Sequence, residues 1–113
     1  MIVVDASVLI AHLDERDALH GRAEAALLDA AERPMGCSVI TLAEILVGPA
    51  RAHRLDRARG ALAGLELSEV PLGPDAAVRL ARLRAETGLK LPDCCVLLAA
   101  EDVAATGVLT LDD

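Results

Sequence analysis

The chain of 113 residues is long enough for one hydrophobic core and too short for two; 54% of its residues are hydrophobic and 26% are charged. It has no Phe, Tyr or Trp, so aliphatic side chains must fill the core, and the lack of aromatic rings weighs against binding single-stranded nucleic acid by base stacking. The net charge of −7 also weighs against a protein that wraps a nucleic acid backbone with its whole surface.

The first predicted element is a strand at residues 2–4, because a run of β-branched residues is typical of a strand buried in a parallel sheet. A short helix is expected at residues 8–13, after a turn that contains Asp5. Apolar residues at helical spacing then predict a helix at residues 18–32, before Pro34. A second short strand is expected at residues 37–40.

The next helix is predicted at residues 41–47, because Thr41 and Glu44 have the spacing of a capping box and a Gly-Pro pair follows. Another helix is expected at residues 50–63. The remaining elements are a strand at residues 67–70, helices at 74–87 and 92–105, and a strand at 108–110. Short apolar strands that alternate with helices predict an α/β fold with a parallel sheet covered on both faces.

Four acidic residues are predicted to lie at one edge of this sheet. Ligand sites in open parallel sheets lie beyond the carboxyl ends of the strands. Asp5 and Asp112 follow the first and last strands, while Glu44 and Asp93 lie in the first turns of two helices. Carboxylates held close together repel one another unless a cation balances them, and Mg²⁺ or Mn²⁺ favours all-oxygen ligands. The sequence therefore predicts a pocket in which a bound metal activates water against a phosphodiester.

Each acid also has a structural explanation. Asp5 is a suitable N-cap, and Glu44 fits the capping box. Asp93 would be favoured in a first turn by the helix dipole. Asp112 could belong to a solvated terminus. Taken singly, these positions do not decide between structure and function.

A basic segment lies in the middle of the acidic chain. Arg51, Arg54, Arg57 and Arg59 fall within nine residues in which Asp56 is the only acid, so the local charge is +3. Such a segment is either a contact for phosphate groups or a solvated helix face.

The N-terminus and the cysteines indicate where the protein works. The start lacks the basic flank and cleavage site of a signal peptide, and no apolar run reaches the length of a membrane span. Cys37, Cys94 and Cys95 lack metal-binding spacing and are typical of reduced thiols. We expect a soluble, cytoplasmic protein without a membrane partner.

Four sequence blocks together resemble the PIN-domain family, and in particular its VapC-type toxins from bacterial toxin–antitoxin pairs. The blocks are VDASVLI (residues 4–10), TLAEILVG (41–48), GLKLPD (88–93) and VLTLD (108–112). The resemblance implies a three-layer α/β/α sandwich and a Mg²⁺- or Mn²⁺-dependent endoribonuclease. It also implies a homodimer and a cognate antitoxin protein that occupies the acidic groove.

The resemblance also assigns roles by position. It makes metal-binding acids of Asp5, Glu44, Asp93 and Asp112. The hydroxyl groups that support them would be those of Ser7 and Thr110. Contacts to RNA or to a protein partner would come from Arg51, Arg54 and Arg57.

Two departures and two alternatives stand beside this interpretation. Family members usually continue through a further helix and strand, so we expect either a short single PIN-like domain at residues 1–113 or a truncated sequence. Asp113 competes with Asp112 as the fourth acid, although the Thr-x-Asp spacing favours Asp112. A catalytically silent PIN-fold module for binding and dimerisation is one alternative. A receiver-like phosphotransfer domain is the other, but it needs a late lysine, and the only lysine, Lys90, precedes Asp93.

Overall fold

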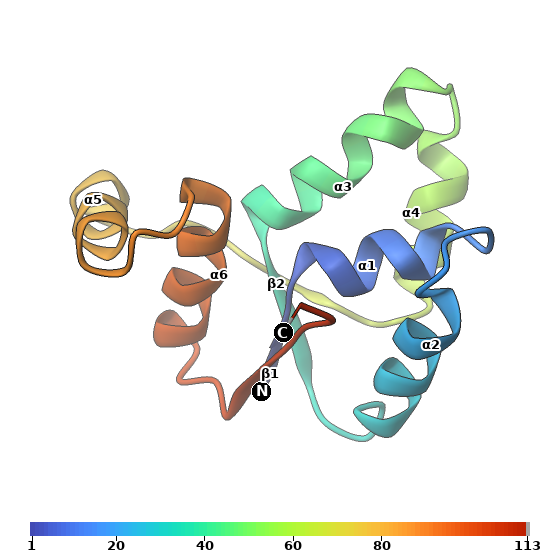
Figure 1. Ribbon diagram of the computed structural model, residues 1–113, viewed down its shortest axis with the longest axis horizontal. Coiled ribbons are helices and arrows are strands. Elements are labelled where there is room, and N and C mark those ends of the chain that lie inside the picture. Colours follow the sequence, from blue (N-terminus) through green and yellow to red (C-terminus); the bar gives the residue numbers. More distant parts are fainter. Residues whose placement is uncertain (113) are drawn as a thin grey trace.

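The computed structural model describes residues 1–112, which form a four-stranded sheet and six helices (Figure 1). The strands are β1 (Ile2–Val4), β2 (Met35–Ser38), β3 (Ser68–Val70) and β4 (Gly107–Leu109). The helices are α1 (Ala6–Leu13), α2 (His20–Asp29), α3 (Val39–Arg51), α4 (Leu55–Ala63), α5 (Ala76–Thr87) and α6 (Leu91–Asp102). The strand order is β3-β2-β1-β4, and all three neighbouring pairs are parallel.

The central strand β1 is apolar along its whole length because helices cover both of its faces. Ile2 and Val4 pack into one cluster with residues of α1 and α2. Val3 points to the opposite face and packs with Val96 of α6. Figure 1 shows α1 to α4 on one side of the sheet and α5 and α6 on the other. The predicted three-layer α/β/α arrangement with a parallel sheet is confirmed.

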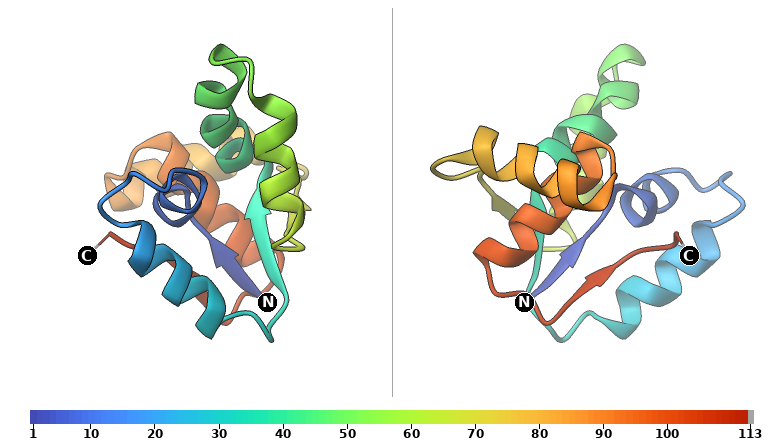
Figure 2. Two further views of the ribbon diagram at one scale, coloured as in Figure 1. Left: turned by 90° about the vertical axis from the view of Figure 1, so that its right-hand side faces the viewer. Right: turned by 60° about the vertical axis from the view of Figure 1, so that its left-hand side comes forward.

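The register of β1 brings the two ends of the chain together. Ile2 pairs with Gly107 and Val4 with Leu109, so β1 and β4 end at the same edge of the sheet. Figure 2 shows these strands running in the same direction from the end at which the N-terminus lies. The residues that follow them, Asp5 on one strand and residues 110–112 on the other, therefore occupy one corner.

The predicted capping box at Thr41 is wrong. Helix α3 begins at Val39, and Ser38 is its N-cap, with Ser38 Oγ accepting a hydrogen bond from the Ile40 backbone N–H at 3.3 Å. The strand before it, β2, ends at Ser38 rather than at residue 40. The β-branched pair after Ser38 has the composition of a strand, but the cap turns the chain into a helix two residues earlier.

The helix prediction for residues 50–63 is also wrong at its start. Pro49 lies inside the last turns of α3, which continues to Arg51 instead of ending at the Gly-Pro pair. The chain then breaks at residues 52–54, where His53 adopts a left-handed φ of 56°. The basic segment is therefore divided between two helices, because Arg51 ends α3 whereas Arg57 lies in α4.

The last helix ends earlier than predicted. Helix α6 stops at Asp102, and Ala104 has a left-handed φ of 49°. Strand β4 begins at Gly107, one residue before the predicted start at residue 108. Within residues 1–112, no helix is long and apolar enough to cross a membrane.

Candidate active site

Asp5 lies in the tight connection between β1 and α1, and it does cap the helix. Its Oδ1 atom accepts hydrogen bonds from the Ser7 backbone N–H at 3.0 Å, from Ser7 Oγ at 2.5 Å and from the Val8 backbone N–H at 3.5 Å. Among residues 1–112, no hydrogen bond to Asp5 Oδ2 is formed. Capping therefore uses one oxygen of the carboxylate and leaves the other available to a ligand.

Ser7 joins this carboxylate to the segment after β4. Ser7 Oγ donates to Asp5 and accepts a hydrogen bond from the Leu111 backbone N–H at 3.0 Å. The Asp5 backbone N–H donates to Leu109 O at 3.1 Å. Thr110 Oγ1 in turn accepts from the Asp112 backbone N–H at 3.0 Å. These bonds hold Asp5 and the exposed Asp112 at the same corner of the sheet. Asp113, the alternative to Asp112, lies outside the described residues.

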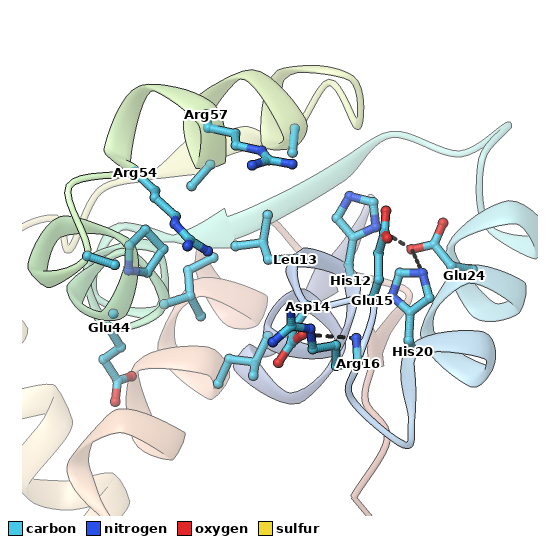
Figure 3. Close-up of a pocket in the computed structure, with 17 residues that line it drawn as sticks. His12, Leu13, Asp14, Glu15, Arg16, His20, Glu24, Glu44, Arg54 and Arg57 are labelled. Atoms are coloured by element: carbon cyan, nitrogen blue, oxygen red, sulfur yellow. Dashed lines mark hydrogen bonds and ion pairs between the residues drawn. The ribbon is translucent and has the colours of Figure 1, made fainter.

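Glu44 and Asp93 belong to two helices that pack against each other, α3 and α6. Both side chains are exposed. Glu44 points toward the α6 ribbon, away from Arg54 (Figure 3). Burial raises the pKa of the Cys95 thiol in α6, and the neighbouring Cys94 and the charge of Glu44 raise it further. Cys95 lies two residues after Asp93 in α6. The effect of Glu44 on Cys95 therefore places the charge of Glu44 near the first turn of α6, which contains Asp93.

No pattern in the sequence predicts that the buried Cys37 thiol lies within reach of the charge of Asp5. Burial and, after it, the charge of Asp5 raise the pKa of the Cys37 thiol to about 12, while the Thr41 hydroxyl acts in the opposite direction. Within residues 1–112, Thr41 Oγ1 is the one buried side-chain polar atom without a hydrogen-bond partner. Its place in a capping-box pattern had suggested a helix cap, but Ser38 fills that position.

The candidate acids fit a divalent metal by their chemistry but are not gathered closely around one point. All four supply carboxylate oxygens, which Mg²⁺ and Mn²⁺ favour, and Asp5 retains an oxygen without a hydrogen bond. In the described part of the chain, however, no three His, Cys, Asp or Glu side chains are close enough to hold an ion between them. Asp5 and Asp112 share one corner, and Glu44 faces α6. That all four act together stays a prediction.

A large groove lies between α1, α2, α3 and α4. It has a volume of about 1050 Å³ and is lined by residues from the end of α1, the loop after it, α2, α3 and α4 (Figure 3). Of the four predicted acids, only Glu44 lines it. Arg54 and Arg57 line it as well, whereas Arg51 does not. The groove is therefore connected to the predicted acids only through Glu44, whose side chain points toward α6 (Figure 3).

Comparison with known proteins gives a consistent result. A family model described as the PIN domain matches residues 2–113. A solved toxin–antitoxin complex from Klebsiella pneumoniae is 28% identical, with a TM-score of 0.77 and 97% of both chains covered. None of the curated proteins matches the chain.

Two further solved structures share the fold at lower identity. VapC20 from Mycobacterium tuberculosis, described as a toxin that cleaves the sarcin–ricin loop, is 18% identical with a TM-score of 0.78. The match covers 99% of this chain and 90% of that one. VapBC2 from Rickettsia felis, bound to a DNA fragment from its promoter, is 17% identical with a TM-score of 0.72, covering 96% and 87%.

Proposed function

The chain belongs to the PIN domain family, and from this membership we propose that it is a metal-dependent endoribonuclease of the cytoplasm, the toxin of a toxin–antitoxin pair. The observation that carries the proposal is the corner formed by Asp5, Ser7 and the segment after β4. There, a carboxylate oxygen without a hydrogen bond and a second acid share one corner at the carboxyl ends of neighbouring parallel strands.

Each acid has its own role in the proposed reaction. Asp5, Asp93 and Asp112 would hold Mg²⁺ or Mn²⁺, which would supply positive charge to the phosphate and lower the pKa of a water molecule. Glu44 accepts a hydrogen bond from the attacking water and orients it. The hydroxyl groups of Ser7 and Thr110 fix the carboxylate of Asp5 and the backbone of Asp112. The water oxygen bonds to phosphorus, the P–O3′ bond breaks, and a proton moves to O3′. The products are a 3′-hydroxyl and a 5′-phosphate.

The proposed partners are an antitoxin protein and a second copy of the chain. The Klebsiella pneumoniae structure, 28% identical over nearly the whole chain, is a toxin–antitoxin complex, which supports the first partner. An exposed helix supports the second. Helix α5 buries none of its residues, and Val78 is 52% exposed. Ion pairs of Arg79 with Asp102, at 2.7 Å, and with Glu101, at 3.0 Å, connect α5 to the end of α6.

The test is cleavage of RNA by the purified protein with Mg²⁺, with Mn²⁺ and with EDTA. We expect cleavage with either metal and none with EDTA, and products that carry a 5′-phosphate. Cleavage that continues in EDTA would contradict the metal dependence. A complete lack of cleavage with both metals would favour a catalytically silent binding module, a reading consistent with acids that are not gathered closely around one point in residues 1–112.

A further inference from the structure

Asp93 differs from Asp5 in what holds its carboxylate. Ser7 fixes Asp5 by hydrogen bonds, whereas within residues 1–112 the carboxylate of Asp93 forms no ion pair. Asp93 is exposed in the first turn of α6, and in the described part of the chain no side chain caps this turn. The first N–H groups of a helix have no partner within the helix, so an uncapped first turn frays easily. The place of Asp93 therefore depends on the backbone that leads into α6.

The body of α6 is firmly packed, and only its start is exposed. From Cys94 onward most residues of the helix are buried, and the helix packs against β1 and β2. Leu91, in contrast, is 50% exposed. The change from exposed to buried falls between Asp93 and Cys94, so packing in the core fixes the helix after Asp93 but not before it.

Residues 88–90 connect α5 to α6, and these two helices pack side by side (Figure 1). The carbonyl oxygen of Leu89, in the middle of this connection, accepts a hydrogen bond from Arg84 Nη1 at 2.6 Å. It also accepts a weaker hydrogen bond from Cys94 Sγ at 3.6 Å. The first donor belongs to the last turn of α5, and the second is the residue next to Asp93. One carbonyl group therefore links the end of α5 to the start of α6.

The N–H group of Leu89 is held as well. It donates to Thr87 Oγ1 at 3.1 Å, and this hydroxyl donates to the carbonyl oxygen of Leu83 at 2.6 Å. The chain turns at Gly88, which has a left-handed φ of 72° and whose N–H donates to the Arg84 carbonyl oxygen at 2.9 Å. Both backbone polar groups of Leu89 are thus bonded to the end of α5, and the connection enters α6 along a defined path.

We propose that Arg84 and Thr87 are positioning residues, which fix the connection at residues 88–90 and thereby hold Asp93 in place for metal binding. The proposal rests on the proposed ribonuclease function and adds the support of a second acid to it. Neither side chain contacts metal or RNA in this account. Ser7 supports Asp5 through the carboxylate itself, whereas Arg84 and Thr87 support Asp93 through the main chain. Supporting hydrogen bonds of either kind affect how well a metal ligand is placed.

The first measurement is amide hydrogen exchange in EDTA, which needs neither metal nor RNA. The probe is the Cys94 N–H, which donates to Lys90 O at 3.0 Å in the first turn of α6. Arg84→Met keeps the aliphatic stem and removes the donor, and Thr87→Val keeps the shape and removes the hydroxyl. Each should speed the exchange of this amide about 3- to 10-fold, as expected for the loss of one hydrogen bond.

Three further variants provide the comparison. Arg82→Met is the matched control, because Arg82 is an exposed arginine of α5 that forms no ion pair within residues 1–112. It should exchange like the wild type. Arg84→Lys keeps a charged donor and Thr87→Ser keeps the hydroxyl, so both should stay closer to the wild type than Arg84→Met and Thr87→Val do.

The second measurement is the affinity for Mn²⁺ by calorimetry without RNA, followed by the Mn²⁺ dependence of RNA cleavage. Arg84→Met and Thr87→Val should bind Mn²⁺ about 3- to 10-fold more weakly. They should need correspondingly more Mn²⁺ for half-maximal cleavage. A role in overall stability alone would lower resistance to urea but would leave the Mn²⁺ affinity of the folded protein unchanged.

The outcomes separate this proposal from the proposed function. If the wild type binds Mn²⁺ and cleaves RNA while Arg84→Met and Thr87→Val match Arg82→Met, the positioning role is overturned and the ribonuclease function stands. Faster exchange at Cys94 with unchanged Mn²⁺ affinity would also overturn it, because the bonds would then hold the turn without placing a ligand. If the wild type neither binds Mn²⁺ nor cleaves RNA, both proposals are overturned.

Discussion

The backbone N–H of Leu111 donates a hydrogen bond of 3.0 Å to Ser7 Oγ, across 104 positions of the sequence. The same hydroxyl donates to Asp5 Oδ1. One small side chain therefore fixes the orientation of a proposed metal-binding carboxylate and holds the segment that carries a second one. Supporting hydrogen bonds of this kind commonly determine how well metal-binding carboxylates are placed.

Replacing Ser7 by alanine should remove both bonds. We expect RNA cleavage to fall roughly 10- to 100-fold, as is usual when a supporting partner of a metal ligand is lost. The free energy of unfolding should fall by about 1–2 kcal/mol, because one of the lost bonds is made to a carboxylate. Ser7→Thr keeps a hydroxyl and should retain much of the activity. Cleavage rates and urea unfolding of the two variants provide the test, and full activity in Ser7→Ala would show that the corner does not depend on this hydroxyl.

Replacing Thr41 by valine should raise the free energy of unfolding of the protein. Its buried Oγ1 has no hydrogen-bond partner within residues 1–112, and an unsatisfied buried polar atom costs about 1–3 kcal/mol. Thr41→Val has nearly the same shape and should raise the free energy of unfolding by about 1 kcal/mol in the absence of metal. The control, Thr41→Ser, keeps the hydroxyl and should not stabilise the protein. A destabilised valine variant in urea unfolding would mean that the hydroxyl does find a partner, for example the Cys37 thiol.

The stability of the protein should decrease above pH 9 because of its buried thiols. The pKa of Cys37 is raised from 9.0 to about 12, first by burial and then by the charge of Asp5. Between these values the unfolded chain loses the proton while the folded chain keeps it, so stability falls as the pH rises. The fall is about 1.4 kcal/mol per pH unit for each such thiol. The chain has no tyrosine and a single lysine, so few other groups titrate in this window.

Urea unfolding at pH 8 and pH 10.5 measures this effect, with Cys37→Ala as the comparison. The variant loses some stability at every pH through the missing sulfur atom, but its decrease between the two pH values should be clearly smaller than that of the wild type. Equal decreases in both proteins would contradict the raised pKa of Cys37.

The exposed helix α5 predicts where two copies of the chain associate. Val78→Asp places a charge on the helix that buries no residue, and it should shift the protein toward the monomer in light scattering coupled to gel filtration. Leu28→Asp on α2 is the matched control, because Leu28 is even more exposed, at 79%, and lies on a different helix. If the Leu28 variant dissociates and the Val78 variant does not, the dimer uses another surface.

The layers of the fold could be predicted because local pattern and burial agree. All three residues of β1 are apolar because both faces of the strand are buried: Val3 faces α6, and its two neighbours face α1 and α2. The start of α3 could not be placed, because Ser38 and Thr41 both suit a helix cap and only the packed structure selects Ser38. The bond from Leu111 to Ser7 depends on distant segments meeting. The residue pattern within one segment cannot predict contacts between segments that are far apart in the sequence.

The central claim is that acids at the carboxyl edge of the sheet cut RNA, and Asp5→Asn tests it most directly. Asparagine is as good an N-cap as aspartate, so the fold should survive while a charged metal ligand is lost. We predict that Asp5→Asn and Asp93→Asn each reduce Mg²⁺- or Mn²⁺-dependent cleavage at least about 100-fold, a loss of roughly 2.7 kcal/mol in transition-state stabilisation. Asp29→Asn, at the end of α2, should retain wild-type activity. Undiminished cleavage by a correctly folded Asp5→Asn protein would contradict the proposed site.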